Sequence, residues 1–422
     1  MSISNVSAQV LYPLPVPDPG ASPEELVARA ASVRQALRDA QMEDDARGYH
    51  SEAMEMQFRK AGFYRILQPK LFGGYEYGLV TFYRVMLEIA RGNPSVGWGL
   101  ALGATHCAVV ASHWPERAQR ELFGPHGDLR APHRVVAVTS NCTPTEGGYT
   151  IDGVWGYCSG IPYATHFLGN ARVKENDKDR QIIFVVTRDQ LTMLDDWGGD
   201  ATLGMRASGS NSVKIEKQFV PSHHVIDAKP GLWAAEPIEH GTPGTKLHGN
   251  PLYLGRMIVP YHLTLVMTVI GAARASLDEF DDNIMKRPTY SPPFIPRFEH
   301  FDFQRAYGYA TALTESAEAL LLSAAEKQTS YLRRWGDTGV PYTLEEQVRL
   351  LGVAQTAGRL ACEAVEHLFH VSSSASAKKG TKMERYFRDA AMYRGHTSSQ
   401  YLSTASGIGR VHYGLPFGLG GL

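Results

Sequence analysis

Apolar positions repeat with helical spacing through the first part of the chain. Apolar or small residues stand three or four positions apart at Leu26, Ala30, Val33 and Leu37, and similar spacing returns between residues 82 and 110. The run Ser22-Pro23-Glu24-Glu25 has the pattern of a capping box with proline in the first turn, which predicts a helix start there. A second helical stretch is expected from about Ser51 to Gly62.

From about Arg130 the pattern changes to short segments rich in β-branched and aromatic residues, with glycine or proline between them. The strand candidates lie at residues 133–138, 149–155, 166–173, 181–187 and 212–220. Together they predict a compact β unit of roughly 100 residues, which is the size of a small sandwich or barrel.

Helical spacing returns beyond a connection rich in glycine and proline at residues 229–251. One helical face carries apolar residues at Leu263, Val266, Met267 and Ile270. Long helices are expected at 301–332 and at 343–369, the second beginning with another capping box, and a last helix is expected from 384 to 402.

The three stretches predict an α+β fold with helices on either side of a β region. The expected division is an N-terminal helical domain at residues 1–129, a middle β-barrel or sandwich domain at 130–235 and a C-terminal helical domain at 236–422. A chain of 422 residues is long enough for two or three packed units.

Charge and cysteine content narrow the class of partner. The chain has 42 Lys+Arg against 43 Asp+Glu, a formal net charge of −1, whereas proteins that bind nucleic acid normally carry a basic excess. Nucleic acid is therefore not the expected partner. A membrane is not expected either, because even the longest apolar stretch, at 263–277, is interrupted by polar residues. Four scattered cysteines without CxxC spacing favour a reducing cytoplasm.

Several familiar catalytic patterns are missing or weak. There is no GxxxxGK[ST] loop and no GxGxxG after a strand, so the chain is not expected to hold its own nicotinamide nucleotide. His126-Gly127-Asp128 has the spacing of a non-haem iron pair but also of a polar turn, which we favour. The pair His223-His224 is expected to be solvated, so no metal is predicted.

The segment Gly156-Tyr157-Cys158-Ser159-Gly160 is one place out of register for the GxSxG elbow of hydrolases. It also lies in a strand-rich region rather than before a helix, so hydrolase chemistry is a weak alternative. Cys158 is either a reactive thiol or a small core residue, and the second interpretation is favoured.

Several separated segments resemble, in the same order, the acyl-CoA dehydrogenase fold. They are Gln68 to Gly74, Asn93 to His106, Leu203 to Ser212, Gly271 to Asp278 and Arg385 to Ala390. The resemblance spans nearly the whole chain. It implies an N-terminal helical domain, a middle β-barrel or sandwich domain and a C-terminal four-helix bundle.

Within that fold, the closer resemblance is to reduced-flavin-dependent monooxygenases, the group that includes the oxygenase component of p-hydroxyphenylacetate hydroxylase. Acyl-CoA dehydrogenases commonly carry a glutamate in a Tyr-Glu-Gly-Thr-like segment, and here that stretch reads Tyr393-Arg394-Gly395-His396-Thr397. The local carboxylate is absent and a histidine is present, as in the hydroxylases. Because some dehydrogenases place their base elsewhere, an acyl-CoA dehydrogenase or oxidase remains an alternative.

The resemblance implies a two-component monooxygenase. A separate flavin reductase would supply FMNH2 or FADH2, and O2 would form a C4a-hydroperoxide that hydroxylates an aromatic, phenolic or polycyclic molecule. Oxygenation of nitrogen or sulfur on the same scaffold, and a flavin-storage or assembly protein without catalysis, remain alternatives. The resemblance also implies a homotetramer, and we expect it in the cytoplasm.

Three residues are candidates for catalysis on the strength of this resemblance. Ser159 matches a flavin-contacting serine and would hydrogen-bond near N5, while His396 could move a proton near the flavin. His106 matches a histidine that meets the phenol oxygen of the substrate. Further flavin contacts are expected from Trp98, Thr139, Ser140, Tyr157, Cys158, Ser208, Ser210, Asn211 and Arg256.

The expected substrate pocket departs from the hydroxylase pattern. Ile161-Pro162-Tyr163 replaces a Cys-Asp-His segment, and Arg134 lies near the position of a serine that contacts the phenol. The lining of this pocket is predicted to include Trp98, His106, Arg134, Tyr163 and His166. The pocket is therefore expected to be rebuilt for a different aromatic substrate.

Overall fold

The computed structural model describes residues 18–175, 178–228 and 240–418. Its N-terminal region contains α2 (Pro23–Arg47), α3 (Glu52–Ala61), α4 (Leu79–Gly92), α5 (Pro94–His113) and α6 (Glu116–Phe123). The predicted capping box is confirmed, because the Glu25 amide donates to Ser22 Oγ at 3.2 Å and the Ser22 amide donates to Glu25 Oε2 at 2.7 Å. The helix expected between Ser51 and Gly62 is α3.

The middle region forms one sheet. Its strands are β1 (His133–Arg134), β2 (Thr139–Thr145), β3 (Gly148–Trp155), β4 (His166–Glu175), β5 (Lys178–Thr187), β6 (Thr192–Met193), β7 (Val213–Pro221) and β8 (Val225–Ala228). The strand order is β6-β7-β3-β2-β4-β5-β8, and β1 lies parallel to β4. Most of these pairs are antiparallel.

The strand expected at 133–138 is wrong beyond its second residue. β1 ends at Arg134 and the chain then bends, leaving Val136 61% exposed and Val138 71% exposed. β-branched residues favour a strand only where a neighbouring strand and a buried face accept them. Here β1 and β2 both pair with β4, and residues 135–138 form the bend between the two pairings, where Val136 and Val138 face outward.

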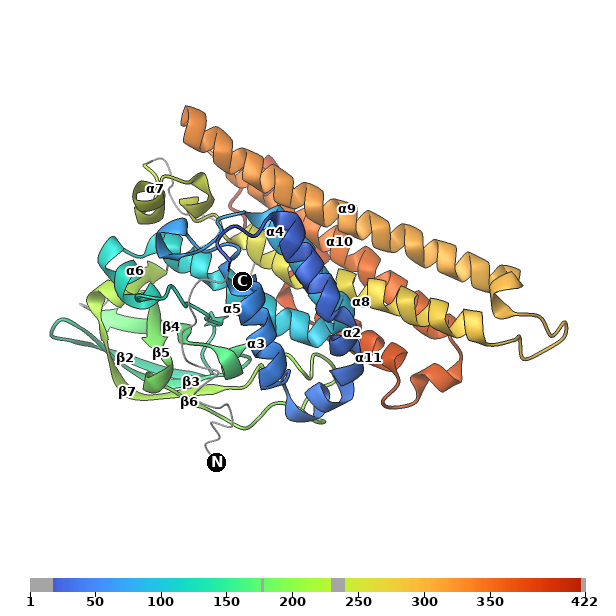
Figure 1. Cartoon of the computed structure of the whole chain (residues 1–422). Coiled ribbons are helices and arrows are strands. Elements are labelled where there is room, and N and C mark those ends of the chain that lie inside the picture. Colours follow the sequence, from blue (N-terminus) through green and yellow to red (C-terminus); the bar gives the residue numbers. More distant parts are fainter. Residues whose placement is uncertain (1–17, 176–177, 229–239, 419–422) are drawn as a thin grey trace.

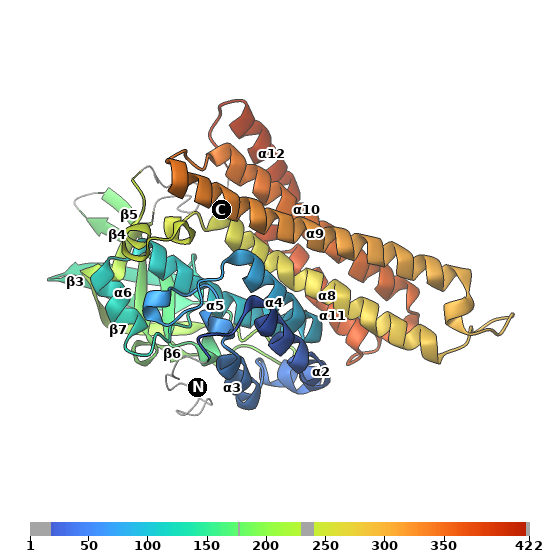
Figure 2. The ribbon, with the colours of Figure 1, turned by 45° about the horizontal axis from the view of Figure 1, so that its top comes forward.

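The C-terminal region contains α7 (Pro243–His248), α8 (Ile258–Lys286), α9 (Phe301–Thr338), α10 (Leu344–Val371), α11 (Lys382–Arg394) and α12 (Tyr401–His412). Helices α8 to α11 form the predicted bundle, with α12 against α10 (Figure 2). The capping box at the start of α10 is confirmed, with Glu346 N–H on Thr343 Oγ1 at 3.2 Å.

The single last helix expected from 384 to 402 is wrong. Helix α11 ends at Arg394, a short 3-10 turn covers Thr397–Ser399, and α12 begins at Tyr401. His396 lies in extended conformation between them, where its Nδ1 accepts the Ser398 amide at 3.1 Å. A side chain that caps a new turn competes with continuation of the old helix.

The two helical regions share one hydrophobic core, and the sheet has its own. Helices α4, α5 and α8 all contribute to the shared core, and α4 packs so closely on α8 that a Cβ on Gly271 would meet Ala90 Cβ at 2.3 Å. Figure 1 shows α8 crossing behind the N-terminal helices, while the sheet lies at the left of the view. Helices α5 and α8 are long and apolar enough to span a membrane, but 100% and 83% of their apolar windows are buried within the protein.

A buried ion network joins α3 to the segment that leads into β1. Arg130 Nη1 donates to Glu55 Oε1 at 2.9 Å, and its Nε donates to Asp128 Oδ1 at 2.9 Å. Glu55 also accepts from Tyr64 Oη at 2.8 Å and pairs with His50. The carboxylate of the His-Gly-Asp triplet is therefore held by arginine, in agreement with the turn interpretation.

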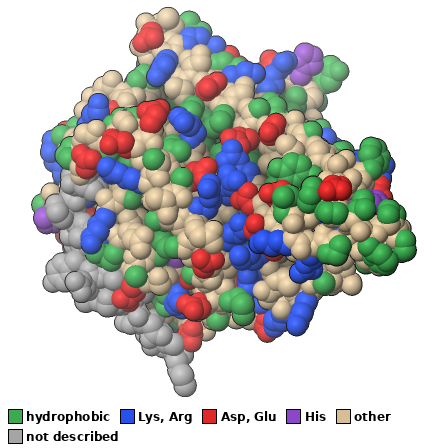
Figure 3. All heavy atoms as spheres, turned by 45° about the vertical axis from the view of Figure 1, so that its right-hand side comes forward, with side chains coloured by type: hydrophobic (Ala, Val, Ile, Leu, Met, Phe, Trp, Pro, Cys, Tyr) green, Lys and Arg blue, Asp and Glu red, His purple; other side chains and the backbone are tan. Residues whose placement is uncertain are grey.

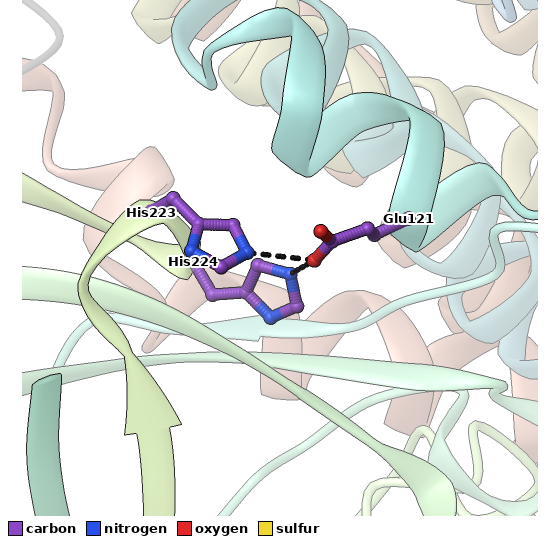
Figure 4. Close-up of side chains that lie close together, drawn as sticks. All are labelled: Glu121, His223 and His224. Carbon is purple, nitrogen blue, oxygen red and sulfur yellow. Dashed lines mark hydrogen bonds and ion pairs between the residues drawn. The ribbon is translucent and has the colours of Figure 1, made fainter. Parts of the chain in front are cut away.

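A second contact joins α6 to the turn between β7 and β8. Glu121 Oε2 lies 2.6 Å from His223 Nε2 and 3.0 Å from His224 Nε2, so both imidazoles meet the same carboxylate oxygen (Figure 4). The two histidine side chains are 19% and 16% exposed. The expectation of a merely solvated pair is corrected, because the pair holds the sheet to the N-terminal helices.

The buried network generates a stability prediction. Arg130→Met leaves the Glu55 and Asp128 carboxylates without their shared cation, and breaking a buried ion pair costs about 3–5 kcal/mol of the free energy of unfolding. Denaturant unfolding followed by circular dichroism measures the loss. Arg117→Met, which removes an exposed pair with Glu121, is the matched control and should change little. Equal effects of the two substitutions would contradict the assignment.

Candidate functional site

A cavity of about 410 Å³ lies where the helical core, the sheet and the segment after α11 meet. Its lining comes from α5, β1, the loop after β3, residues 197–210, α8 and residues 392–397. The residues are Trp98, Leu102, Pro132, His133, Arg134, Tyr157, Ser159, Trp197, Met205, Ser210, Tyr261, Leu265, Met392, Tyr393, Gly395, His396 and Thr397. They include many aromatic side chains and no carboxylate among the residues described.

A chain of hydroxyl groups runs along one side of the cavity. Trp98 Nε1–H donates to Ser159 Oγ at 3.0 Å, Ser159 Oγ lies 2.7 Å from Ser210 Oγ, and Ser210 Oγ lies 2.6 Å from Ser208 Oγ. Because the indole N–H only donates, Ser159 Oγ must accept from it. The Ser159 O–H is therefore left to donate, either to Ser210 or to a bound ligand.

The loop that carries Ser159 can approach α5 because both segments have glycine there. A Cβ on Gly160, whose φ is +87°, would meet the Gly99 carbonyl oxygen at 2.5 Å, and a Cβ on Gly99 would meet the Ser208 carbonyl oxygen at 2.5 Å. Only glycine permits such approach of one backbone to another. These glycines place the Ser159 and Ser208 loops on the helix that carries Trp98.

His396 is held in a defined neutral form. Its Nδ1 accepts the backbone N–H of Ser398, so in the neutral ring the proton resides on Nε2. Burial, and then the nearby charge of Arg134, lower the pKa of His396 to about 4. The ring stands edge to face with Trp98, 5.4 Å between centroids. Near neutral pH, His396 therefore offers an Nε2–H group to the cavity.

His106 lies behind the cavity wall, and two residues of that wall cover it. Its ring centroid is 5.6 Å from that of His133 and 5.4 Å from that of Tyr261, both of which line the cavity. Its Nδ1–H donates to the Ala131 carbonyl at 2.7 Å, which leaves Nε2 as a buried acceptor with no partner among the described residues. Burial, with a smaller contribution from His133, lowers the pKa of His106 to about 3.

Arg134, Tyr157 and Trp197 form another part of the lining. The Arg134 guanidinium lies 5.7 Å from the centroid of the Tyr157 ring, and the Tyr157 ring stands edge to face with Trp197 at 5.4 Å. Tyr157 adopts φ +59° and is 57% exposed, so its ring forms part of the opening. Both tyrosine and tryptophan present flat apolar faces to a ligand.

Four of the predicted flavin contacts, Trp98, Tyr157, Ser159 and Ser210, line the cavity, and Ser208 touches it through Ser210. The others lie outside the lining. Cys158 points into the core of the sheet, where burial raises its thiol pKa strongly, and Asn211 is buried beside it with its amide on the Leu194 carbonyl. Thr139 and Ser140 are exposed on β2.

The structure does not bring Arg256 to the cavity. Its backbone carbonyl accepts from Gln328 Nε2 at 2.9 Å, and its guanidinium lies 5.9 Å from the Tyr342 ring centroid. This places it in the helical core between α8, α9 and the start of α10. The physical reason is register, because the residue lies two positions before α8 and the helix start turns it inward.

Two residues predicted for the substrate pocket also lie elsewhere. Tyr163 Oη donates to the His50 carbonyl at 2.6 Å, and the side chain packs among N-terminal residues. His166 lines a second depression of about 450 Å³ together with Glu121 and Asp189. Both follow the same motif as Ser159, but the turn at Ile161–Tyr163 points them to the far side of the loop.

Sequence reasoning missed several lining residues. Tyr261 and Leu265 lie four positions apart on α8, so helical spacing could have placed them on one face but not against the cavity. His133 carried no motif. Trp197 precedes the recognised Leu203 to Ser212 segment in an irregular loop, and no spacing indicates which way it points.

Buried histidines around the cavity generate a prediction about pH. Burial lowers the pKa of His262 to about 4, whereas an unfolded chain binds the same proton near pH 6.5. The contribution of His262 to stability therefore falls as the pH drops from 6.5 to 4. His262→Leu should reduce the slope of the unfolding free energy by up to about 1.4 kcal/mol per pH unit.

Denaturant unfolding at several values between pH 4 and 7 measures this slope. Val259→Ala, a packing change on the same buried helix, is the control and should lower stability equally at each pH. Parallel curves for His262→Leu and the unaltered protein would contradict the prediction.

Comparisons with known proteins agree with this geometry. Residues 263–401 match the family described as acyl-CoA dehydrogenase, C-terminal domain. The chain is 27% identical, over 89% of its length and 95% of the relative's, to the oxygenase subunit of a flavin-dependent monooxygenase from Rhodococcus jostii. It is 24% identical to the oxygenase component of p-hydroxyphenylacetate 3-hydroxylase from Acinetobacter baumannii, over 90% and 87% of the two chains.

A solved structure shows the same architecture over nearly the whole chain. It is XiaF from Streptomyces sp. in complex with FADH2 and glycerol, with a TM-score of 0.83, 23% identity and coverage of 95% of this chain and 98% of the other. The resemblance read from the sequence is thereby confirmed. This protein has the acyl-CoA dehydrogenase fold, and within that fold it is similar to the oxygenase components of flavin-dependent monooxygenases.

Proposed function

We propose that the protein is the oxygenase component of a two-component flavin-dependent monooxygenase. It takes FMNH2 or FADH2 from a separate, diffusing reductase and uses O2 to hydroxylate an aromatic, phenolic or polycyclic small molecule. The observation that carries the proposal is one cavity that combines the Trp98–Ser159–Ser210 chain, the Nε2–H of His396 and aromatic walls.

The lining favours this reaction over acyl-CoA dehydrogenation. A dehydrogenase needs a carboxylate near the flavin to remove a proton beside a thioester, and no Asp or Glu lines the cavity in the described part of the chain. His396, which lies two residues after the end of α11, places an imidazole there instead. A neutral imidazole at this position donates a hydrogen bond from Nε2 and does not replace the missing carboxylate base.

The cavity residues fit a flavin. Trp98, Tyr157 and Trp197 supply flat apolar faces for a ring system, and the Ser159 O–H supplies a directed donor for a ring nitrogen. When bound, reduced flavin supplies the electrons that activate O2. Ser159 would bind and orient the ring, while the aromatic walls exclude water from its reactive edge.

His396 and His106 have separate roles in this proposal. His396 holds a proton at Nε2 and donates a hydrogen bond from it to an oxygen in the cavity, and its low pKa keeps the ring neutral near pH 7. His106 presents an acceptor at Nε2, which would receive a phenol O–H only if Tyr261 or His133 moves aside. His133 lines the cavity directly.

The decisive experiment mixes anaerobically reduced FMN or FAD and the protein with oxygenated buffer in a stopped-flow spectrometer. We expect a transient absorbance that belongs neither to reduced nor to oxidised flavin, followed by formation of oxidised flavin. Flavin that oxidises as it does in buffer would contradict the proposal, and bleaching of bound oxidised FAD by an acyl thioester would favour the dehydrogenase.

Variants assign the residues within this experiment. Ser159→Ala and His396→Asn should each shorten the lifetime of the transient species by about tenfold or more. The reason is that one hydrogen bond to a charged group is worth about 1.5–3 kcal/mol. His412→Asn, an exposed histidine on α12, is the matched control. A normal lifetime and product yield in both variants would remove these residues from the site. A flavin-storage protein would bind flavin and yield no product with any reductase.

We also propose a homotetramer in the cytoplasm. Exposed hydrophobic residues gather where α8 connects to α9, including Tyr290 at 86%, Phe294 at 71% and Phe301 at 67% exposed. Figure 3 shows hydrophobic side chains clustered on the right of the molecule, over that end of the bundle. Exposed apolar patches of this kind mark association surfaces. Four free, buried cysteines suit a reducing compartment.

Light scattering in solution tests the assembly. The unaltered protein should have a mass four times that of one chain, and the triple substitution Tyr290→Ser, Phe294→Ser, Phe301→Ser should yield smaller species. Met42→Ser, which alters a hydrophobic residue on α2 that is 64% exposed, is the control and should leave the tetramer intact. A stable monomer of the unaltered protein would contradict the proposal.

A further inference from the structure

Arg134 is a cation placed at the cavity without a carboxylate partner. It lines the cavity from β1, its Nε is buried, and no hydrogen bond or ion pair to it is found among the described residues. Two arginines that are more deeply buried are paired with carboxylates: Arg130 binds Asp128 and Glu55, and Arg388 binds Glu384 and Asp45. Burying a charge without a partner costs free energy, which an anion in the cavity would recover.

The surroundings of Arg134 supply no negative charge to balance it. No lining residue in the described part of the chain is acidic, and the neighbouring histidines, His133 and His396, are neutral near pH 7. Asp196, next in sequence to the lining residue Trp197, already accepts the Ser212 amide at 2.9 Å and points to solvent. The cavity therefore has a positive charge, polar imidazoles and aromatic walls, with no internal counter-ion.

The Arg134 guanidinium also lies beside an aromatic ring, so one planar ligand can contact both. Its guanidinium lies 5.7 Å from the Tyr157 centroid, and a guanidinium can stack on a ring while its fork binds a carboxylate. A ligand with an aromatic body and an anionic end would satisfy both features at once. A neutral ligand would leave the charge unpaired.

We infer that the substrate of the proposed oxygenase is an aromatic molecule carrying a carboxylate, and that Arg134 binds that group. The inference rests on the proposed function for its reaction, but it concerns only ligand charge. Another anion of the same chemistry is the phosphate of the flavin itself. The two sources predict different behaviour of an Arg134 variant.

Binding without flavin and without turnover tests the inference. The probes are 4-hydroxybenzoate and 4-hydroxybenzamide, which are nearly equal in shape and differ in charge, and quenching of the protein's tryptophan fluorescence reports binding because Trp98 and Trp197 line the cavity. We expect the carboxylate to bind about tenfold or more tightly than the amide, as suits a charge-assisted hydrogen bond. Arg134→Gln should abolish this preference and Arg134→Lys should retain part of it.

Two controls make the result decisive. Arg188→Gln removes an arginine that lines the second depression and should leave the preference unchanged, and circular dichroism confirms that each variant is folded. Equal affinity of the two probes for the unaltered protein, or a preference that survives Arg134→Gln, would overturn the inference. So would an Arg134→Gln variant that loses affinity for FMNH2 but not for reduced riboflavin, since Arg134 would then bind the flavin phosphate.

The outcome is separable from that of the proposed function. The probe measurement needs no oxygen, so a charge preference that depends on Arg134 supports the inference even where the stopped-flow experiment shows no oxygenase behaviour. Oxygenase behaviour combined with equal affinity for charged and neutral probes would overturn the inference alone.

Discussion

The complete burial of helix α5 is the constraint on which the rest of the structure depends. Every one of its residues is buried, so all of its neighbours must pack on it, and the helix can accept them because it is built largely of small residues. Gly99 lets the Ser208 backbone approach, and Gly103 receives the Ala131 amide at 3.0 Å on its carbonyl. One helix therefore fixes the relative position of the bundle, the sheet and the loops around the cavity.

The same helix presents the chemistry of the cavity at helical intervals. Trp98, Leu102 and His106 are four positions apart, so they lie along one face, with Trp98 at the hydroxyl chain and His106 behind His133 and Tyr261. The hydroxyl chain needs this arrangement, because the indole N–H determines which way the Ser159 hydroxyl donates. The packing of α5 therefore fixes the position of the Trp98 indole, and the indole fixes the direction of the Ser159 hydrogen bond.

The features that the sequence predicted well are local ones. Helix starts at Ser22 and Thr343 depend on a cap and one turn, and Trp98, Ser159 and His396 were found through short motifs whose backbone geometry is local. Orientation depends on tertiary packing instead. The motif that located Ser159 could not show that the next turn carries Tyr163 to the far side, and no pattern joined His133 on β1 to Tyr261 on α8.

The shortness of β1 is explained by what lies on either side of it. Upstream, the buried Arg130 network ties the chain to α3, and downstream the chain bends away at residues 135–138 to reach β2. The two residues between these anchors, His133 and Arg134, are the ones that face the cavity. A longer strand would have buried its alternate side chains in the sheet. An unpaired arginine can be held at the cavity because a paired one four residues earlier fixes the backbone that carries it.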